Sequence, residues 1–397
     1  MRWVEQPSRR ANLWLGATLL LAMLTATGVV WLQPDSPDAF YGPPSDLAQY
    51  EPGDLLRAEP FERGLARGVT GWRVLYRSTD ADGLPLAVSG LVLVPTDPPA
   101  DGPRPLVTIA HGSTGVAEDC APSLSARPLA SLPGVDEALD AGFVVAASDL
   151  PGLGTPGPHP YLIGSTSAHA VLDAARTASE LVETDPERLA VWGFSQGGHA
   201  ALFTGELASA YAPELPLRGV VAFAPATDLA RIMRDGQGTV FSTLLVVNTA
   251  VAWSDATDGL ELEDVIAEDA VTIAREIGGR CLDGTSLPAS TVQSVRLRDD
   301  IASLDDPAAA AWGPLLAENT PSGRLDVPLL VFQGTADPLI DPAITEDHVR
   351  ARCEAGDEVE LRLVRGAEHF TLVPRTAEAA LRWTEDRFAA RPLSGAC

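Results

Sequence analysis

The sequence predicts a doubly wound α/β domain with a mostly parallel sheet and one helical insertion. Short, continuously apolar runs recur along the chain, and helical patterns lie between most of them. Continuous apolarity indicates strands that are buried on both faces, as in a parallel sheet. Strands that alternate with helices are typical of the doubly wound arrangement. The alternation stops over residues 229–322, which predicts the insertion.

Composition narrows the classes of function. A chain of 397 residues, 46% of them hydrophobic, can bury a sizeable core and suits one large domain with insertions. The formal net charge of -26 repels phosphate backbones, so no nucleic-acid partner is expected. All 28 basic residues are arginines, which excludes chemistry that needs a lysine amine, such as Schiff-base formation.

An apolar segment near the N-terminus predicts export from the cytoplasm. Residues 11–32 carry no charge, and as a helix they would span about 33 Å, enough to cross a bilayer core of about 30 Å. Arg9 and Arg10 precede the segment and acidic residues follow it, so residues 1–10 are expected to form a short cytoplasmic tail. The segment is either an uncleaved signal anchor or a cleaved signal peptide, and both predict an extracytoplasmic location.

The remaining chain divides into a linker and a folded domain. Residues 33–60 are rich in Pro, Gly and Asp and predict a linker or docking segment, and residues 61–397 predict the domain. The apolar runs that predict strands cover residues 72–77, 86–95, 105–111, 143–149, 189–194, 220–224, 327–333 and 359–364. Helical patterns cover residues 168–183, 198–210, 342–353 and 377–389.

The strongest local pattern is Gly-x-Ser-x-Gly around Ser195. Gly193 and Gly197 flank this serine, an apolar run precedes them, and a helical pattern follows. A tight strand-to-helix turn holds such a serine in a strained conformation, and small flanking residues avoid clashes. The start of the helix provides backbone N–H groups and the positive end of its dipole for a developing oxyanion. Ser195 is therefore predicted to be a nucleophile.

A serine hydroxyl needs a base, and the base needs an acid that orients it. After a nucleophile elbow, the acid and then the histidine follow along the chain. His369 lies in a loop after an apolar run and is the predicted base. Asp337, in the turn after residues 327–333, is the predicted acid. Asp341 and Asp228 are the alternatives for the acid, and Asp341 is also placed to cap the next helix.

Two backbone N–H groups are expected to form the oxyanion hole. One belongs to Gln196, and the other belongs to Ser113 or Thr114 in the oxyanion loop (residues 111–115). The tight turn over residues 149–154 is expected to wall the site. The other histidines are predicted to have structural positions. His111 is expected to shape the oxyanion loop, and His199 is expected to pack in the protein interior. His348 is expected on a helix surface, and His159 and His169 are expected on a loop or helix surface.

The cysteines suggest disulfides and not a metal site. Cys120, Cys281, Cys353 and Cys397 form an even set that suggests two disulfides outside the cytoplasm, with three possible pairings. Zinc-like Cys/His spacing does not occur, so no structural metal is expected. No cofactor is expected either, because the chain lacks His-Glu-x-x-His and a dinucleotide-binding loop would need a third glycine after residues 152–154.

Several short motifs occur in one combination: residues 76–80 (YRSTD), 88–92 (VSGLV), 119–123 (DCAPS), 152–156 (GLGTP), 209–214 (SAYAPE), 333–337 (QGTAD) and the Ser195 elbow. With them, the chain resembles the secretory lipase family, the lipase A type of α/β-hydrolase, from about residue 40 onward. The resemblance implies the α/β-hydrolase fold, a helical lid and hydrolysis of carboxylic esters, including triacylglycerols. It maps a triad onto Ser195, Asp337 and His369.

The same resemblance implies the disulfides Cys120–Cys281 and Cys353–Cys397. Thr114 departs from the family, which has an acidic residue at about this position. The apolar N-terminal segment also departs from a freely secreted enzyme.

Together these observations predict an exported serine lipase or esterase that acts through an acyl-enzyme. The expected partner is a small-molecule or lipid ester, with contact to a lipid interface. We expect the insertion over residues 229–322 (the cap) to cover the nucleophile, either as a mobile lid or as a fixed wall of the acyl pocket. The alternative functions are a serine peptidase or acyl-aminopeptidase, an acyltransferase, and a non-catalytic surface protein. No oligomeric state is predicted.

Overall fold

A computed structural model describes residues 36–99, 102–235, 239–282, 287–297, 300–301, 307–393, 395 and 397. The predicted cytoplasmic tail (residues 1–10) and the apolar segment (residues 11–32) lie outside the described residues. Within the described ranges, no helix is both long enough and apolar enough to cross a membrane.

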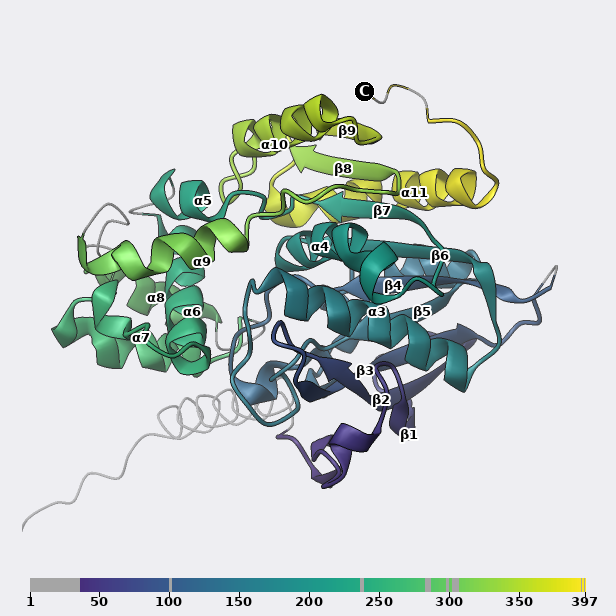
Figure 1. The fold of residues 1–397 in the computed structure, drawn as a ribbon, viewed down its shortest axis with the longest axis horizontal. Helices are drawn as coiled ribbons and strands as arrows, with labels where there is room; N and C mark the ends of the chain where they lie inside the picture. The colour runs from purple at the N-terminus through teal and green to yellow at the C-terminus, as the bar shows by residue number, and fades with distance from the viewer. Residues whose placement is uncertain are drawn as a thin grey trace, which may run out of the picture.

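A nine-stranded sheet with the order β1-β2-β3-β5-β4-β6-β7-β8-β9 forms the centre of the molecule (Figure 1). Strands β1 to β3 and the β3–β5 pair are antiparallel, and the strands from β5 through β9 in this order are parallel. The strands are β1 (Leu55–Phe61), β2 (Val69–Thr79), β3 (Pro85–Pro95), β4 (Arg104–Ala110), β5 (Val144–Ser148), β6 (Thr184–Phe194), β7 (Leu217–Phe223), β8 (Leu329–Gly334) and β9 (Val359–Val364). The predicted mostly parallel α/β architecture is confirmed.

Strand β1 begins inside residues 33–60, the segment that the sequence predicts to be a linker or docking segment. Its residues Leu55–Phe61 pair with β2, so the last part of this segment belongs to the sheet. β1 is an edge strand, and most of it is half-buried or exposed, with Pro60 facing solvent. An edge strand of this kind needs no continuous apolar run, and for this reason the apolarity criterion does not find it.

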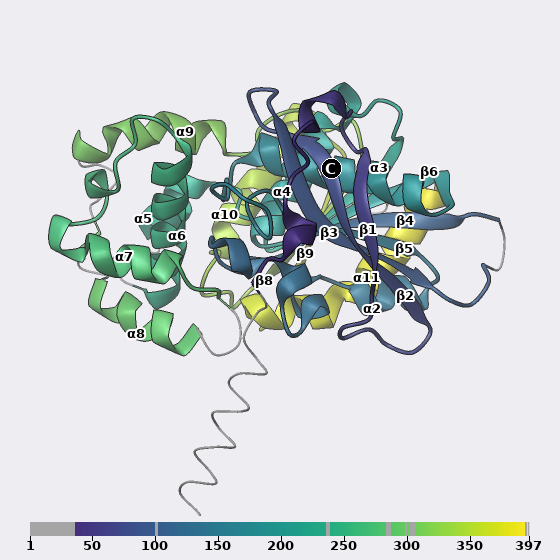
Figure 2. The ribbon, with the colours of Figure 1, turned by 90° about the horizontal axis from the view of Figure 1, so that it is seen from below.

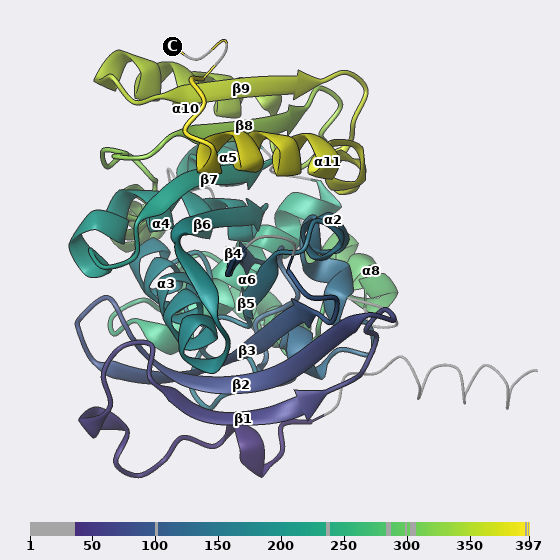
Figure 3. The same cartoon turned by 90° about the vertical axis from the view of Figure 1, so that its right-hand side faces the viewer.

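Helices cover both faces of the sheet, as Figure 3 shows. Helices α3, α4 and α10 pack on one face, and α2 and α11 pack on the other. Their bounds are α2 (Val135–Asp140), α3 (Gly164–Leu181), α4 (Gln196–Tyr211), α10 (Pro342–Ala355) and α11 (His369–Phe388). On β4, Leu106 joins the core under α3 and α4, and Val107 joins the core under α2 and α11. Strands buried on both faces explain the continuous apolar runs of the sequence.

The cap is a separate group of helices between β7 and β8, and it lies to one side of the sheet (Figure 2). It contains α5 (Leu229–Asp235), α6 (Val240–Ala256), α7 (Val271–Gly278), α8 (Leu287–Leu297) and α9 (Trp312–Glu318). In the hydrophobic core of the cap, Trp253 and Trp312 stack with ring centroids 5.9 Å apart. Tyr161 and Leu162, which precede α3, and Ile344 of α10 belong to the same core. The cap is thus a small helical layer whose core continues into the sheet domain.

Two disulfides fasten distant parts of the chain. Cys120, after the oxyanion loop, pairs with Cys281 in the cap, with Cα atoms 5.1 Å apart. Cys353 on α10 pairs with Cys397, with Cα atoms 5.5 Å apart. This is the connectivity that the family resemblance implies. The first disulfide gives the cap an attachment to the sheet domain besides its two chain connections.

Removing the Cys120–Cys281 disulfide is expected to destabilise the fold more than removing Cys353–Cys397. The two bridges close sequence separations of 161 and 44 residues, and loop-closure entropy then gives about 5 and about 4 kcal/mol, respectively. Denaturant unfolding of the Cys120→Ala/Cys281→Ala and Cys353→Ala/Cys397→Ala variants measures the two losses. A larger loss for the Cys353–Cys397 pair would contradict the expectation.

Candidate active site

Ser195 occupies a strained turn between β6 and α4. Its φ of 55° and ψ of -114° lie in a region that non-glycine residues seldom adopt. Its backbone N–H donates to the carbonyl of Phe223 on the neighbouring strand β7, at 2.9 Å. A Cβ on Gly193 would overlap the carbonyl oxygen of Gly197, and a Cβ on Gly197 would overlap the carbonyl oxygen of Ala110. The two glycines of the motif are therefore required by close backbone packing.

The structure brings the three predicted triad residues together. His369 Nε2 lies 3.0 Å from Ser195 Oγ, and His369 Nδ1 lies 2.8 Å from Asp337 Oδ2. His369 and Asp337 are both buried. Since the Asp337 carboxylate accepts a hydrogen bond from Nδ1–H, Nε2 is left free to accept the Ser195 proton. The arrangement can activate a serine hydroxyl as a nucleophile.

The Asp337 carboxylate is fixed by donors on its own turn. Its Oδ1 accepts hydrogen bonds from the backbone N–H groups of Leu339 and Ile340, at 2.9 and 3.0 Å. Its Oδ2 also accepts from Gln333 Nε2 at 3.2 Å. Together these donors hold the carboxylate in one orientation toward His369.

The two alternative acids serve as helix caps. Asp341 accepts a hydrogen bond from the backbone N–H of Ala343 at the start of α10, at 2.9 Å. Asp228 accepts from the backbone N–H of Arg231 at the start of α5, at 3.0 Å. Side-chain acceptors at these positions satisfy N–H groups that have no partner within the helix.

The sequence predicted that His369 lies in a loop, and this is wrong. His369 is the first residue of α11. Glu368 caps this helix and forms a reciprocal capping box with Thr371. The apolar pattern that predicted a helix only from residue 377 missed its first two turns, because Pro374 and polar residues interrupt the pattern there. The histidine therefore sits on a regular element packed against the sheet.

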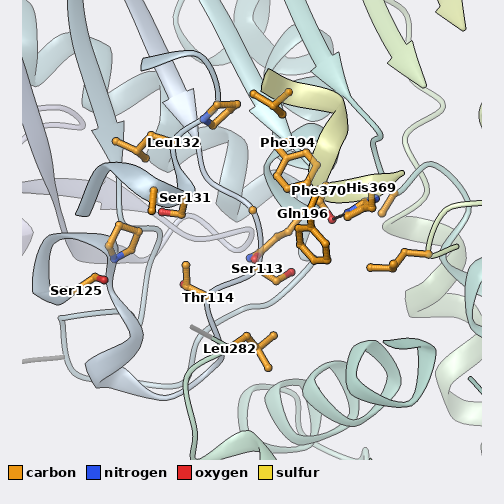
Figure 4. A pocket seen from close by; sticks show the side chains of 18 of the residues that line it. Ser113, Thr114, Ser125, Ser131, Leu132, Phe194, Gln196, Leu282, His369 and Phe370 are labelled. Atoms are coloured by element: carbon orange, nitrogen blue, oxygen red, sulfur yellow. Dashed lines mark hydrogen bonds between the residues drawn. The ribbon is translucent and has the colours of Figure 1, made fainter. Parts of the chain in front are cut away.

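The predicted oxyanion donors line the same pocket as Ser195 and His369. Gln196 is the first residue of α4, so its backbone N–H has no partner within the helix. Ser113 and Thr114 lie beside Gln196 in Figure 4, at the end of β4. The Ser113 hydroxyl is 2.5 Å from the Tyr161 hydroxyl, and the Thr114 carbonyl accepts a hydrogen bond from Leu282 N–H of the cap at 2.7 Å.

A mostly apolar cavity of about 710 Å³ opens onto the nucleophile. Its walls come from residues 122–137, from α6 of the cap and from the start of α11. Phe241 on α6 and Phe370 on α11 have ring centroids 6.4 Å apart and are 39% and 64% exposed. A cavity of this size and polarity suits a small apolar ligand or an acyl chain.

Several histidines lie deeper than the sequence predicted. His159 is buried, not on a surface: its Nδ1 lies 2.6 Å from the carbonyl of Pro151, and its Nε2 lies 3.0 Å from Gln196 Nε2. His169 is half-buried and stacks on Tyr211, with ring centroids 3.8 Å apart. His348 on α10 is also half-buried. No sequence motif indicates the contact between His159 and Gln196, because Gln196 lies 37 residues further along the chain.

Burial also controls the charge of these side chains. It lowers the pKa of His159 to about 4, although the Pro151 carbonyl opposes the shift. It lowers the pKa of His199, which is buried as predicted, to about 4 as well.

Asp119, Cys120 and Cys281 lie close enough together to share a metal ion, but both sulfurs belong to the disulfide and are not thiolate ligands.

The secretory lipase family matches residues 131–292 and 315–396 of the chain. A probable inactive lipase of Mycobacterium tuberculosis is 28% identical over 90% of this chain and 83% of its own. Lipase 5 of Candida albicans is 25% identical over 93% and 84%, and trichothecene C-3 esterase of Fusarium sporotrichioides is 25% identical over 90% and 85%. The X-ray structure of Candida antarctica lipase A has the same fold, with a TM-score of 0.75 and 20% identity over 90% of this chain and 86% of that chain.

Gly193→Ala is expected to destabilise the protein and to displace Ser195, because the added methyl group would overlap the Gly197 backbone. Overpacking of this kind costs about 1–3 kcal/mol. Gly313→Ala on α9 is the matched control: nothing lies within 4 Å of the added atom, and alanine is favoured over glycine in a helix by up to about 1 kcal/mol. Denaturant unfolding and labelling of Ser195 by a fluorophosphonate measure both effects. Equal stability and labelling in the two variants would contradict this account of the elbow.

Proposed function

The chain belongs to the secretory lipase family, and from this membership we propose that it is an exported serine esterase or lipase with Ser195, His369 and Asp337 as its triad. The family and the relatives named as lipases and esterases make the chain a carboxylic ester hydrolase. The observation that carries the finer proposal is the continuous hydrogen-bonded path from Asp337 through His369 to Ser195. Because one relative is named as a probable inactive lipase, this hydrogen-bonded path is the feature of the chain that an experiment must test.

In the first half of the reaction, Ser195 Oγ attacks the ester carbonyl while His369 Nε2 takes the hydroxyl proton. Asp337 stays ionised and stabilises the imidazolium that forms. The carbonyl oxygen becomes an oxyanion, which the backbone N–H groups of Gln196 and Thr114 stabilise in this proposal. Each such donor contributes roughly 3–4 kcal/mol to transition-state stabilisation in serine hydrolases.

In the second half, His369 gives its proton to the leaving alcohol oxygen, and the acyl group stays on Ser195 as an ester. A water molecule then attacks this acyl-enzyme, with His369 again as base, and the carboxylic acid leaves. Transfer to an alcohol acceptor in place of water would make the same site an acyltransferase. Besides the ester and water, the proposed steps use only groups of the chain itself.

The walls of the cavity support an apolar acyl group as the substrate, and acylglycerols are the lipid esters that we propose. Leu129, Leu132 and Val135 line one side of the cavity, and Leu244 and Leu245 of the cap line another. Burying each methylene group of an acyl chain there gains about 0.8 kcal/mol. Exposed Phe241 and Phe370 at the cavity support contact with a lipid surface.

The two disulfides and the family support a location outside the cytoplasm. We propose that residues 11–32 direct this export, either as an uncleaved anchor or as a cleaved signal peptide. The N-terminal sequence and membrane association of the mature protein decide between the two.

Ser195→Ala is expected to lower kcat on p-nitrophenyl esters by several orders of magnitude, because members of a triad act as a unit. Asp337→Asn is expected to lower kcat about 10⁴-fold, because the neutral amide no longer holds the reactive tautomer of His369. Asp341→Asn is the matched control, since Asp341 caps α10 four positions away, and its kcat should stay within a few-fold of wild type. An acyl series from acetyl to palmitoyl, with an emulsified triacylglycerol, defines the substrate range. Unchanged turnover in Ser195→Ala would refute the proposal.

A mobile cap predicts a rise in activity when substrate passes its solubility limit, because a lipid surface would stabilise exposed apolar groups. Phe370→Ser is expected to reduce the ratio of activity on emulsified to soluble ester. Leu84→Ser is the matched control, since Leu84 is 60% exposed but lies in the turn between β2 and β3. The measurement uses the chain without residues 1–32, so that no anchor holds it on lipid. Smooth saturation without a jump would favour a fixed cap and a soluble ester.

A further inference from the structure

His111 begins the oxyanion loop and is buried, and both of its ring nitrogens face carbonyl oxygens. Nδ1 lies 2.6 Å from the carbonyl oxygen of Gly112, and Nε2 lies 2.9 Å from the backbone carbonyl oxygen of Asp149. A carbonyl oxygen only accepts hydrogen bonds, and a neutral imidazole has only one N–H. A neutral His111 would therefore leave one lone pair pressed against a carbonyl oxygen. Only the doubly protonated ring satisfies both contacts.

We propose that His111 is held as an imidazolium cation, with the buried Asp149 carboxylate as its counter-ion, and that this pair positions the oxyanion loop. The charge state follows from the contacts of His111 and Asp149 alone. The positioning role rests on the proposed function, because it concerns the loop that carries an oxyanion donor.

The partners of Asp149 are those of an ionised carboxylate. Its Oδ1 accepts from the backbone N–H of Ser123 at 2.9 Å, and its Oδ2 accepts from the hydroxyls of Ser123 and Ser89 at 2.5 and 2.7 Å. The Tyr41 hydroxyl lies 3.0 Å from Ser123 Oγ, so Tyr41 can supply the proton that Ser123 accepts while Ser123 donates to Asp149. None of these donors carries a charge, and a buried anion needs a cation nearby.

Burial raises the pKa of Asp149, and the hydrogen bonds from Ser123 and Ser89 and the charge of His111 oppose that rise. Asp149 and His159, the titratable groups that face His111, both come from the segment that follows β5. Burial is the main cause of the lowered pKa of His159, and the positive charge of His111 lowers it further.

Two other buried histidines provide an internal contrast. His159 faces one acceptor, the Pro151 carbonyl, and one donor, Gln196 Nε2, which together suit a neutral ring. His199 Nε2 faces the Asn319 carbonyl at 2.8 Å, and its Nδ1 has no hydrogen-bond partner among the described residues. Neither ring has two acceptors. The surroundings therefore assign a different charge to His111 than to His159 and His199.

The cation has a mechanical effect on the loop. Its Nδ1–H holds the Gly112 carbonyl, and its Nε2–H ties the loop to the turn after β5. If His111 loses a proton, one of these attractions becomes a repulsion, and the loop shifts relative to Gln196. An oxyanion exists only in the tetrahedral state, so the shift lowers kcat and leaves KM almost unchanged. His111 is a positioning residue, since it acts through the loop.

Nitrogen-15 NMR of the chain labelled in its histidine rings tests the charge directly. At pH 7 we expect both ring nitrogens of His111 to carry protons, and only one each in His159 and His199. The His111→Asn variant identifies the His111 signals by their loss. Asp149→Asn is expected to return His111 to a neutral ring. An unprotonated ring nitrogen on His111 of the wild type at pH 7 would overturn the proposal, and this readout needs no variant and no catalytic activity.

Kinetics on a soluble ester tests the positioning role. His111→Asn is expected to lower kcat about 10- to 100-fold, the usual effect of a misplaced catalytic group, with KM within about threefold. His199→Asn, which also removes a buried ring, is the control and should keep the wild-type kcat. An unchanged kcat in His111→Asn would overturn the positioning role. A wild type that carries the imidazolium but hydrolyses no ester would support the charged pair and refute the proposed function.

Discussion

The close backbone packing at Gly193 and Gly197 is the constraint on which the rest of the site depends. Because no side chain fits at either position, the turn between β6 and α4 can press against the end of β4. The hydrogen bond from Ser195 N–H to Phe223 then fixes the turn against β7 as well. The nucleophile thus occupies a point that three parallel strands define, and Asp337 and the oxyanion loop approach it from the carboxyl ends of strands in the same sheet.

The oxyanion loop is supported by elements from three other parts of the chain. The backbone carbonyl of Asp149 after β5 accepts from His111, the hydroxyl of Tyr161 before α3 contacts that of Ser113, and the backbone N–H of Leu282 in the cap donates to the carbonyl of Thr114. Since each support binds a different residue of a short loop, the loop has little freedom to move alone. Tyr161 also accepts a hydrogen bond from Trp253 of α6 through its carbonyl, at 2.7 Å. The cap therefore contacts the loop directly through Leu282 and indirectly through Tyr161.

The sequence was sufficient to predict the elements that leave a short motif or an apolar run in it. Ser195 was predictable because close backbone packing allows only glycine at positions 193 and 197, and this leaves a recognisable motif. Asp337 and His369 were predictable because they follow apolar strands. Strand β1 was not, since its half-exposed edge position leaves no apolar run. The helical position of His369 was missed because polar residues and Pro374 begin α11. The contacts of His111 and His159 have no signature at all, since they join residues brought together only by the folded sheet.

The Cys120–Cys281 bridge has a consequence for the timing of maturation. Inside a reducing compartment the two sulfurs would remain thiols. The cap would then be held by its two chain connections, by packing against residues such as Ile344, and by the hydrogen bond from Trp253 to Tyr161. Only oxidation adds a covalent link beside the nucleophile, from Cys120 after the oxyanion loop to the cap. In a chain that first meets an oxidant after export, this link would be the last part of the site to form.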